Sequence, residues 1–502
     1  MRLLFERECC IPRDEVLKGE LKEDLFAARL QAVMEGKAEE VYQNPAIFFA
    51  NTYPTEGLKV LLTEALGRLS GQKAASSPII RLETSFGGGK THNLIALKHL
   101  ADGFRGPGIE ALVDSALLPE EAVAVAGFVG SELDPENGLE HNGLRTFTPW
   151  GEIAYQLGGP VGYQRIAHSD QQGIAPGAAT LEELVGNRPA LIMLDELAHF
   201  LRVAKAKKIG DTNLADMTIA FLMSLFQLAA SKARVVVVLT LAETFDAYGK
   251  ETEELRQRLA EAKSLAARQE RVITPTAETE IAAIVTHRLF KYVNRDAAQE
   301  TAAAYYNFYQ QLQNQNANIP GLATRSEYSQ QIIDEYPFHP TFLKTLNTKT
   351  ATIPNFQRTR GALRLLAMTI RRLWENRPAD TYLIHPHHLD LGVGEIVAEL
   401  TSRLDRPQFR SIVEADIISS QMGTLAKAQD LDRHWVEAGK PPYAQRLATT
   451  IFLHSLTQGV ASGVDPAELF LSVLTPGDDP LLLQQALDRL AQQRIERLHG
   501  LG

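Results

Sequence analysis

The residues around Lys90 constrain the fold of this chain more than any other segment. The apolar run 78–82 is typical of a buried strand. The glycine-rich sequence Glu83-Thr-Ser-Phe-Gly-Gly-Gly-Lys-Thr-His92 follows it, and the apolar run 93–100 predicts a helix. A strand, a glycine-rich turn and a helix in this order predict an α/β unit whose turn binds a phosphate group.

The residue types in this turn suit phosphate chemistry. Glycines let backbone N–H groups surround a phosphate, and the start of the helix adds a partial positive charge. We expect Lys90 to reach the β and γ phosphates of ATP and the Thr91 hydroxyl to bind Mg²⁺. The segment departs from the P-loop pattern G-x-x-x-x-G-K-[ST] at Thr84, where the pattern has glycine. The predicted nucleotide contacts are Ser85, Phe86, Gly87, Gly88, Gly89, Lys90, Thr91 and His92.

A second motif lies further along the chain. The continuous apolar run 190–194 is typical of a parallel strand that is buried on both faces, and it ends in Asp195 and Glu196. This is the Walker B pattern. We expect Asp195 to order the Mg²⁺ that Thr91 holds, through the water shell of the ion, and Glu196 to polarise the attacking water. A buried strand that ends in two exposed acids is the alternative, but the glycine-Lys-Thr turn upstream favours a nucleotide site.

A third apolar strand, 234–241, follows a helical pattern at 217–230. In additional-strand P-loop enzymes this strand lies between the two Walker strands, and a polar residue at its end contacts the γ phosphate or water. Thr240 is the candidate for this sensor, and a core threonine without a role is the alternative. A charged helix is expected at 252–270 and a short strand at 271–275.

Beyond residue 275 the pattern becomes helical. Apolar residues at helical spacing predict a helix over 278–292, and a basic amphipathic helix is expected over 358–372. The Gln- and Asn-rich stretch 305–318 is expected to be a surface excursion. Helical patterns also occur at 443–456, 465–474 and 480–490.

The order of these elements resembles the AAA+ ATPases of the origin-recognition and archaeal-initiator type. In that family an arginine before the last strand reaches the γ phosphate of a neighbouring subunit, which implies Arg268 here, or Arg271 as the second candidate. The helix at 358–372 resembles the sensor 2 helix of the family's helical lid. This implies a role for Arg360, with Arg358 and Arg364 as alternatives.

A narrower resemblance is to a prokaryotic family known as domain of unknown function 499. Besides the glycine loop, four segments carry it: Phe48-Phe-Ala-Asn-Thr-Tyr-Pro-Thr55, Trp150-Gly-Glu-Ile-Ala154, Leu194-Asp-Glu-Leu-Ala198 and Tyr336-Pro-Phe-His-Pro340. Threonine at position 84 is usual in that family. Its members tend to be encoded beside DNA methyltransferases and helicases in phage-defence clusters. The resemblance implies such partners for this chain.

The predicted fold is therefore α/β, a P-loop parallel sheet flanked by helices, with a helical lid and a winged-helix-like C-terminal region. The expected divisions are an N-terminal helical segment 1–50, an ATPase core 51–275 with an insertion near 101–189, a lid 276–376, and the region 377–502. The insertion is expected to lie on the nucleotide face, where it covers the sheet or carries partner contacts. Since the chain stops at Gly502, where the family's wing would begin, we expect the wing to be lacking.

Composition limits the remaining options. The chain has 502 residues, 45% of them apolar, and a net charge of −10, so general binding of polyanions is not expected and any DNA contact needs a local basic patch. The apolar runs are predicted to be too short to span a bilayer, which takes about 20 residues. Two adjacent cysteines, Cys9 and Cys10, form no disulfide framework, and a reducing cytoplasm is expected.

Two local clusters leave alternatives open. The basic run 202–208 could contact a phosphate backbone, but a solvated surface is favoured at this net charge. The sequence His385-Pro-His-His388 suggests a metal site, but it lacks a Cys, Asp or Glu partner at ligand spacing, which favours a structural role.

The leading hypothesis is a Mg²⁺-dependent ATPase of the AAA+ type that couples its nucleotide state to conformational change or assembly. We expect it to form a homo-oligomer and to act in a DNA-directed or phage-defence system. The alternative is a nucleotide-gated scaffold with little turnover. Motor-driven DNA translocation is a weaker third hypothesis, since helicase motifs are not recognisable.

Overall fold

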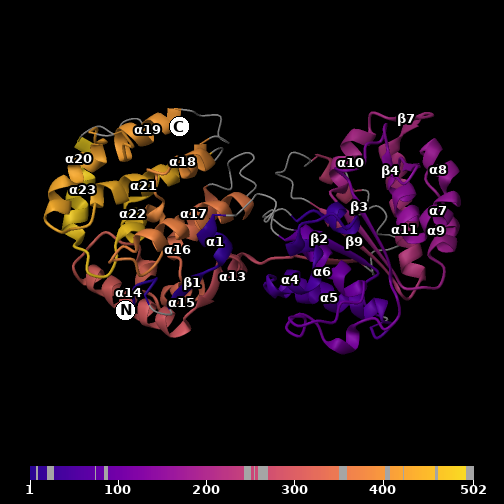
Figure 1. The fold of residues 1–502 in the computed structure, drawn as a ribbon, viewed down its shortest axis with the longest axis horizontal. Helices are drawn as coiled ribbons and strands as arrows, with labels where there is room; N and C mark the ends of the chain where they lie inside the picture. The colour runs from indigo at the N-terminus through magenta and orange to yellow at the C-terminus, as the bar shows by residue number, and fades with distance from the viewer. Residues whose placement is uncertain are drawn as a thin grey trace. The chain divides into compact units, whose positions relative to one another are not determined.

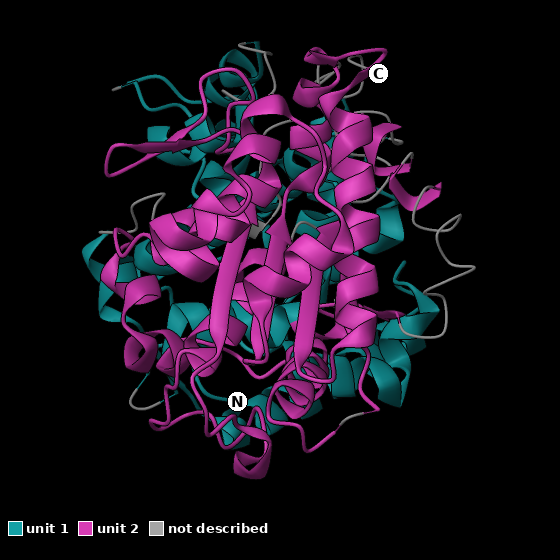
Figure 2. Ribbon diagram, turned by 90° about the vertical axis from the view of Figure 1, so that its right-hand side faces the viewer, with its two compact units in different colours: residues 1–26, 281–502 teal, residues 27–280 magenta. Residues whose placement is uncertain are grey.

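The computed structural model describes residues 1–6, 9–19, 28–73, 75–83, 89–241, 250–253, 255–257, 270–349, 359–401, 408–421, 423–457 and 462–492. The chain divides into two compact units (Figures 1 and 2): unit 1 holds residues 1–26 and 281–502, and unit 2 holds residues 27–280. The expected segment 1–50 is therefore shared between the units. Its first part joins unit 1 because β1 (Cys10–Pro12) pairs antiparallel with β11 (Phe290–Val293).

A five-stranded parallel sheet forms the centre of unit 2 (Figure 2), as the apolar runs predicted. Its strand order is β10-β2-β9-β6-β3. The prediction that the third apolar strand lies between the strands before the glycine loop and before Glu196 is confirmed: β9 pairs with β2 on one side and with β6 on the other. The strands are β2 (Ile79–Glu83), β3 (Ala124–Val129), β6 (Ala190–Asp195), β9 (Val235–Leu241) and β10 (Glu270–Ile273).

Helices cover both faces of this sheet because its inner strands β6 and β9 have apolar residues on both faces. On one face Val236 and Val238 pack with α5 and α6, and on the other Val235 and Val237 pack with α7, α9, α10 and α11. The helices in the described part of unit 2 are α2 (Leu30–Met34), α3 (Glu40–Gln43), α4 (Pro45–Ala50), α5 (Glu56–Leu69), α6 (Lys90–Ala101), α7 (Pro149–Gln164), α8 (Ala167–Gln172), α9 (Ala178–Val185), α10 (Leu197–Ala204) and α11 (Leu214–Ser231), with 3-10 turns η2 (Ser115–Leu117) and η3 (Glu278–Glu280).

Helix α11 corrects the expectation that the apolar runs are too short for a bilayer. By length and composition alone it could cross a membrane, with 18 residues and a mean hydropathy of 1.5. Its side chains Phe221, Leu222 and Leu225, however, belong to the core beneath the sheet. A helix that covers β9 in the core of a protein needs the same apolar composition as a membrane helix. Helix α11 is therefore only weak support for a membrane segment.

The predicted insertion is built around two buried carboxylates. Glu152 of α7 lies 2.6 Å from Nε2 of His141 and accepts a hydrogen bond from Thr146 at 2.8 Å, both from the hairpin of β4 (Leu139–His141) and β5 (Leu144–Thr146). Asp170 of α8 accepts hydrogen bonds from Thr148 and Tyr163. These hydrogen bonds join the hairpin to α7, and α7 to α8. A second small hairpin, β7 (Lys208–Ile209) and β8 (Thr212–Asn213), follows α10.

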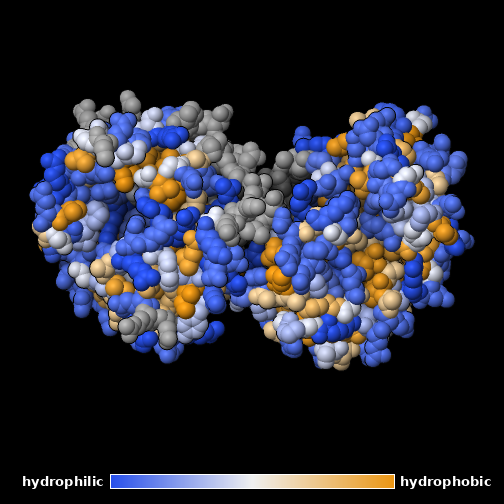
Figure 3. All heavy atoms as spheres, in the orientation of Figure 1, coloured by the Kyte–Doolittle hydropathy of each residue, from blue (hydrophilic) through white to orange (hydrophobic). Residues whose placement is uncertain are grey.

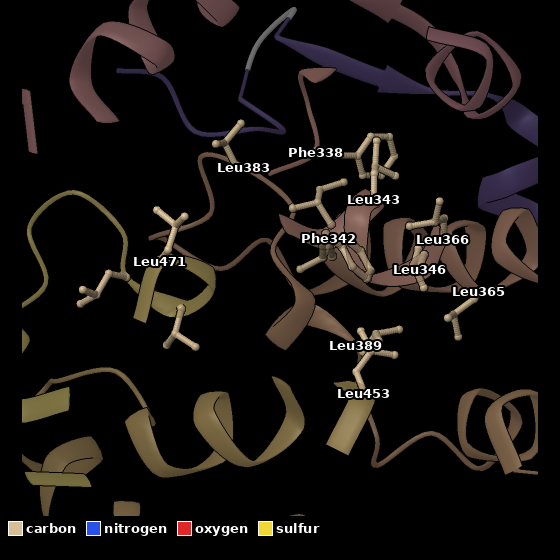
Figure 4. Packing of buried hydrophobic residues seen from close by; sticks show 14 of the residues in the cluster. Phe338, Phe342, Leu343, Leu346, Leu365, Leu366, Leu383, Leu389, Leu453 and Leu471 are labelled. Carbon is tan, nitrogen blue, oxygen red and sulfur yellow. The ribbon is translucent and has the colours of Figure 1, made fainter. Parts of the chain in front are cut away.

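Unit 1 is mainly helical and has its own apolar core, part of which is shown in Figure 4. Phe338 and Phe342 belong to the same buried cluster as Leu383 and Leu471 from later in the chain. The helices are α1 (Asp14–Lys18), α13 (Ile281–Leu289), α14 (Arg295–Asn314), α15 (Ser326–Glu335), α16 (Pro340–Thr348), α17 (Thr359–Asn376), α18 (Gly394–Thr401), α19 (Gln408–Ile412), α20 (Lys427–Glu437), α21 (Tyr443–Ser455), α22 (Pro466–Val473) and α23 (Pro480–Gln492), with 3-10 turns η4 (Gly321–Thr324) and η6 (Pro386–His388) and a π-helical turn η8 (Val413–Ile417).

One expectation for unit 1 was wrong, and another was confirmed only over part of its range. The stretch 305–318 is no surface excursion, because α14 runs through it to Asn314 and buries Tyr305, Tyr309 and Leu312 on one face. Its Gln and Asn residues lie mostly on the other face. The helix predicted over 278–292 ends at Leu289, where the chain turns into β11 to pair with β1. The helices predicted at 358–372, 443–456, 465–474 and 480–490 are confirmed as α17, α21, α22 and α23.

The surface of both units is mainly hydrophilic on the face drawn in Figure 3, with smaller hydrophobic patches between the charged side chains. This distribution is ordinary for a globular protein.

Candidate functional site

The two sequence motifs meet at the carboxyl edge of the sheet of unit 2. Asp195 is the last residue of β6 and is buried, and Thr91 lies in the first turn of α6. The Thr91 hydroxyl donates a hydrogen bond of 2.8 Å to Oδ2 of Asp195. These two residues are 104 positions apart in the sequence and are in direct contact, because α6 packs on the face of the sheet to which Asp195 points.

Thr240 belongs to the same group. Its hydroxyl donates a hydrogen bond of 2.6 Å to Oδ1 of Asp195 and accepts one of 3.3 Å from the backbone N–H of Glu196. The two oxygens of Asp195 are therefore held from both sides, by Thr91 and by Thr240. In this arrangement Thr240 positions the carboxylate, and its predicted contact with a γ phosphate stays a prediction.

The start of α6 has the geometry that a phosphate site needs. Gly89 caps the helix with a φ of +90°, a left-handed conformation that favours glycine, and Lys90 is the first helical residue. A Cβ atom on Gly89 would lie 3.0 Å from Oγ1 of Thr276, so a side chain would also be crowded there. Among the predicted contacts, Ser85, Phe86, Gly87 and Gly88 lie outside the described residues.

The side chain of His92 contacts the segment 48–55, and its predicted nucleotide contact stays a prediction. Its Nε2 lies 2.9 Å from Oγ1 of Thr52, and its ring stacks on Phe48 at 4.4 Å between centroids. Both partners come from the segment 48–55 that the sequence analysis singled out. Thr55 of this segment donates a hydrogen bond to the carbonyl of Pro275, just after β10. The segment 48–55 thus contacts both the first turn of α6 and the residues that follow β10.

Glu196 is held in a strained conformation. Its φ of +51° and ψ of 32° lie in the left-handed region, and it stands before the first turn of α10 with its side chain exposed. The backbone of Gly130 lies against it, since a Cβ on Gly130 would come within 2.2 Å of the carbonyl oxygen of Glu196. Strained residues cluster at functional sites. Sequence reasoning missed Gly130, because only the fold brings the ends of β3 and β6 together.

This strain has a measurable consequence. We expect Glu196→Gly to be more stable than Glu196→Ala by about 1 kcal/mol in the free energy of unfolding, because glycine adopts a positive φ without the steric cost that a Cβ imposes. Both variants lack the carboxylate, so the comparison isolates the backbone. Urea denaturation measures the difference. An alanine variant as stable as the glycine variant would show that Glu196 is not strained.

The predicted arginines are less well supported. Arg268 and Arg358 lie outside the described residues, and so does the side chain of Arg360. Arg271 of β10 pairs with Glu64 of α5 at 2.7 Å, and Arg364 of α17 pairs with Glu399 of α18 at 3.1 Å. The roles of Arg268 and Arg360 stay predictions.

The residues at the edge fit a magnesium nucleotide. Thr91 and Asp195 offer a hydroxyl and a carboxylate oxygen 2.8 Å apart, which are the hard oxygen ligands that Mg²⁺ prefers. Lys90 and the N–H groups at the start of α6 supply positive charge for phosphate. Asn93, one turn into α6, is buried, and its Nδ2 has no hydrogen-bond partner in the described part of the chain.

The basic run 202–208, which begins in the last turn of α10, is largely engaged within the chain. Arg202 donates a hydrogen bond of 2.7 Å to Glu251, and Lys205 lies 4.0 Å from the same carboxylate. Lys207 donates a hydrogen bond to the carbonyl of Pro135. These contacts favour the structural role for this run over a contact with nucleic acid.

The histidine cluster of unit 1 also serves the structure. His385 stacks on His339 at 4.4 Å, lies 2.8 Å from the Tyr305 hydroxyl through Nε2 and contacts the carbonyl of Ser472 through Nδ1. Among the described residues, no group of three or more His, Cys, Asp or Glu side chains could hold a metal ion. The structural role that the sequence favoured is therefore supported.

Acid is expected to destabilise unit 1. Desolvation lowers the pKa of His339, His387 and His388 well below the ordinary value and lowers that of His385 to about 3. On unfolding these imidazoles regain a pKa near 6.5 and take up protons below that pH. The stability is thus complete above pH ~6.5 and falls at lower pH, by about 1 kcal/mol for each histidine at pH 5.5.

Two carboxyl groups oppose this effect in part. Burial raises the pKa of Glu335 to about 7 and that of Asp432 to about 6, so they bind protons in the folded state. Urea denaturation at pH 7.5 and 5.5, followed by the fluorescence of Trp374 and Trp435 in unit 1, measures the net change. In His387→Leu the dependence on pH should be weaker. Equal or greater stability at pH 5.5 would contradict the prediction.

Comparison with known proteins agrees with the division into two units. The model of the DUF499 N-terminal domain matches residues 10–276, and the model of the DUF499 second domain matches residues 276–469. No curated protein matches the chain.

Proposed function

The chain belongs to the DUF499 family, and for this member we propose the function of an ATP-binding, Mg²⁺-dependent ATPase with a P-loop fold of the AAA+ type. The observation that carries the proposal is the hydrogen bond between Thr91 and Asp195, which joins the glycine-Lys-Thr helix to the acidic end of β6. The strand order supports it, because β9 is inserted between the strands that bear the two motifs. Ligands bind at the carboxyl ends of such sheets, where the chain connections change direction.

In the proposed mechanism each residue has one task. Lys90 and the N–H groups of α6 bind the β and γ phosphates. Thr91 and Asp195 would hold Mg²⁺, and the bound ion would neutralise charge on the phosphates. Thr240 keeps Asp195 in place, and Glu196 accepts the proton of the attacking water. Arg360 and, in an oligomer, Arg268 would complete the site.

A turnover assay tests the proposal against the scaffold alternative. We expect Mg²⁺-dependent release of phosphate from ATP in single-turnover and steady-state experiments, with and without duplex DNA. A background rate in every condition, together with stable binding of ATP or ADP, would favour the scaffold. A hydrolysis rate that rises only with DNA would support a role in a DNA-directed system. Both this role and the methyltransferase and helicase partners follow from the family resemblance and stay predictions.

A further inference from the structure

A histidine in the first turn of α10 contacts the backbone that supports Glu196. His199 is the third residue of this helix. Its Nδ1 lies 3.3 Å from the carbonyl oxygen of Gly130, the residue that follows β3. Its backbone N–H donates a hydrogen bond of 3.0 Å to the carbonyl of Glu196 itself. His199 was not among the residues that the sequence analysis assigned to the site.

The contact between His199 and Gly130 fixes one form of the imidazole. A carbonyl oxygen can only accept a hydrogen bond, so Nδ1 of His199 carries the proton. At 3.3 Å this hydrogen bond is long, so its contribution is the position that it sets rather than a large stabilisation. The ring is half-buried, and the next residue, Phe200, packs edge-on against Phe128 of β3 at 5.4 Å between centroids, which holds α10 against β3.

The backbone of Gly130 is held from three sides by the segment 195–199. Its N–H donates a hydrogen bond of 2.9 Å to the carbonyl of Asp195, and its carbonyl accepts the one from His199. Its Cα faces Glu196, since a Cβ there would lie 2.2 Å from the carbonyl oxygen of Glu196. So close an approach requires glycine. The end of β3 is therefore a support around which the turn between β6 and α10 closes.

Glu196 needs this support because its backbone conformation is unfavourable by itself. A residue with a Cβ is strained at a positive φ, and Glu196 has a φ of +51°. Such a conformation persists only where the surrounding structure holds it. The hydrogen bonds that Asp195 and His199 make with Gly130 lie on either side of Glu196 in the chain. They hold the turn that leaves the side chain of Glu196 exposed, next to the buried Asp195.

We propose that His199 is a positioning residue for Glu196. By donating a hydrogen bond to the carbonyl of Gly130, it keeps the left-handed turn at Glu196 and so sets the direction of the carboxylate toward the attacking water. His199 acts through the backbone of Gly130 and takes no proton in the reaction. The inference rests on the proposed function and adds to it a residue whose loss slows hydrolysis without weakening nucleotide binding.

Substitutions of His199 in the full chain separate the hydrogen bond from the bulk of the ring. His199→Phe keeps the ring without the donor, and single-turnover hydrolysis of ATP should slow by about two- to tenfold, the equivalent of one ordinary hydrogen bond. His199→Asn places an amide N–H near the position of Nδ1, so it should recover most of the parent rate. Isothermal titration with a non-hydrolysable ATP analogue and Mg²⁺ should give the parent affinity for both variants.

The decisive measurement repeats His199→Phe in a chain that already carries Glu196→Gln. Without the carboxylate there is nothing for His199 to position, so the residual rate should not fall further. A residue that only stabilises the fold would slow hydrolysis alike in both backgrounds. Gly130→Ala disturbs the same turn from the other side, because its Cβ would meet the Glu196 carbonyl, and it should slow hydrolysis with nucleotide binding intact.

His168 provides the matched control. It is an exposed histidine of α8, so His168→Phe and His168→Asn should leave both the rate and the affinity unchanged. Melting temperatures without nucleotide show whether each variant is folded.

The outcomes separate the inference from the proposed function. A slower rate in His199→Phe that His199→Asn restores, and that disappears in the Glu196→Gln background, would support the positioning role. The parent rate in His199→Phe, equal losses in the Phe and Asn variants, or the same loss in both backgrounds would overturn the inference and leave the role of Glu196 standing. If the parent chain hydrolyses no ATP, the proposed function fails and the inference fails with it.

Discussion

Replacing Glu196 with glutamine is expected to leave ATP bound while hydrolysis slows by about 10²- to 10⁴-fold, the usual contribution of a general base. The side chain is exposed at the carboxyl edge, next to Asp195, and its backbone N–H is fixed by Asp195 and Thr240. Glutamine keeps the size of the side chain but cannot accept the proton of the attacking water. Single-turnover release of phosphate measures the rate, and equilibrium titration measures binding.

Glu132→Gln is the matched control for this prediction. Glu132 follows β3 and pairs with Arg29 at the surface, at 3.5 Å, so its replacement should change neither binding nor rate. Hydrolysis by Glu196→Gln at the parent rate would exclude Glu196 as the base. Loss of ATP binding in this variant would instead point to a role in holding the nucleotide.

Replacing Lys90 with alanine is expected to abolish detectable ATP binding. Two charge-assisted hydrogen bonds to phosphate, at about 1.5–3 kcal/mol each, correspond to a loss of roughly 10²- to 10⁴-fold in affinity. The αL cap at Gly89 and the first turn of α6 fix the position of Lys90 at the helix start. Titration with ATP and Mg²⁺ measures the change, and the melting temperature without nucleotide shows that the fold is intact.

Lys98→Ala provides the control on the same helix. Lys98 lies two turns further along α6, where it pairs with Asp102 at 2.6 Å, so its loss should not affect nucleotide binding. ATP binding by Lys90→Ala with the parent affinity would show that the glycine loop does not hold the phosphates.

Much of the sheet could be predicted because its strands carry a local signal. The apolar runs that became β2, β6 and β9 carry a polar residue at or next to their carboxyl ends: Glu83, Asp195 and Thr240. Since parallel strands end at the same edge, Thr91, Asp195 and Thr240 could be assigned to one site before their contacts were known. The structure confirms these contacts, and the nucleotide itself stays a prediction.

Other features could not be predicted, because they depend on contacts between distant residues. Gly130 and His199 are 69 positions apart, and nothing in either local sequence marks their contact. The role of His92 depends on Thr52 and Phe48, which the fold places against α6. At α14 the many Gln and Asn residues led to the prediction of a surface excursion, although tyrosines at helical spacing form a buried face there.

Equilibrium titration of the parent chain with ATP and Mg²⁺ tests the central claim most directly. The account predicts saturable binding at one site per chain, with half-saturation at about 1 μM to 1 mM ATP, the usual range for enzymes and their substrates. The binding should be lost in Lys90→Ala and retained in Lys98→Ala. Absence of saturable binding at millimolar ATP, in a chain that melts cooperatively, would contradict the account.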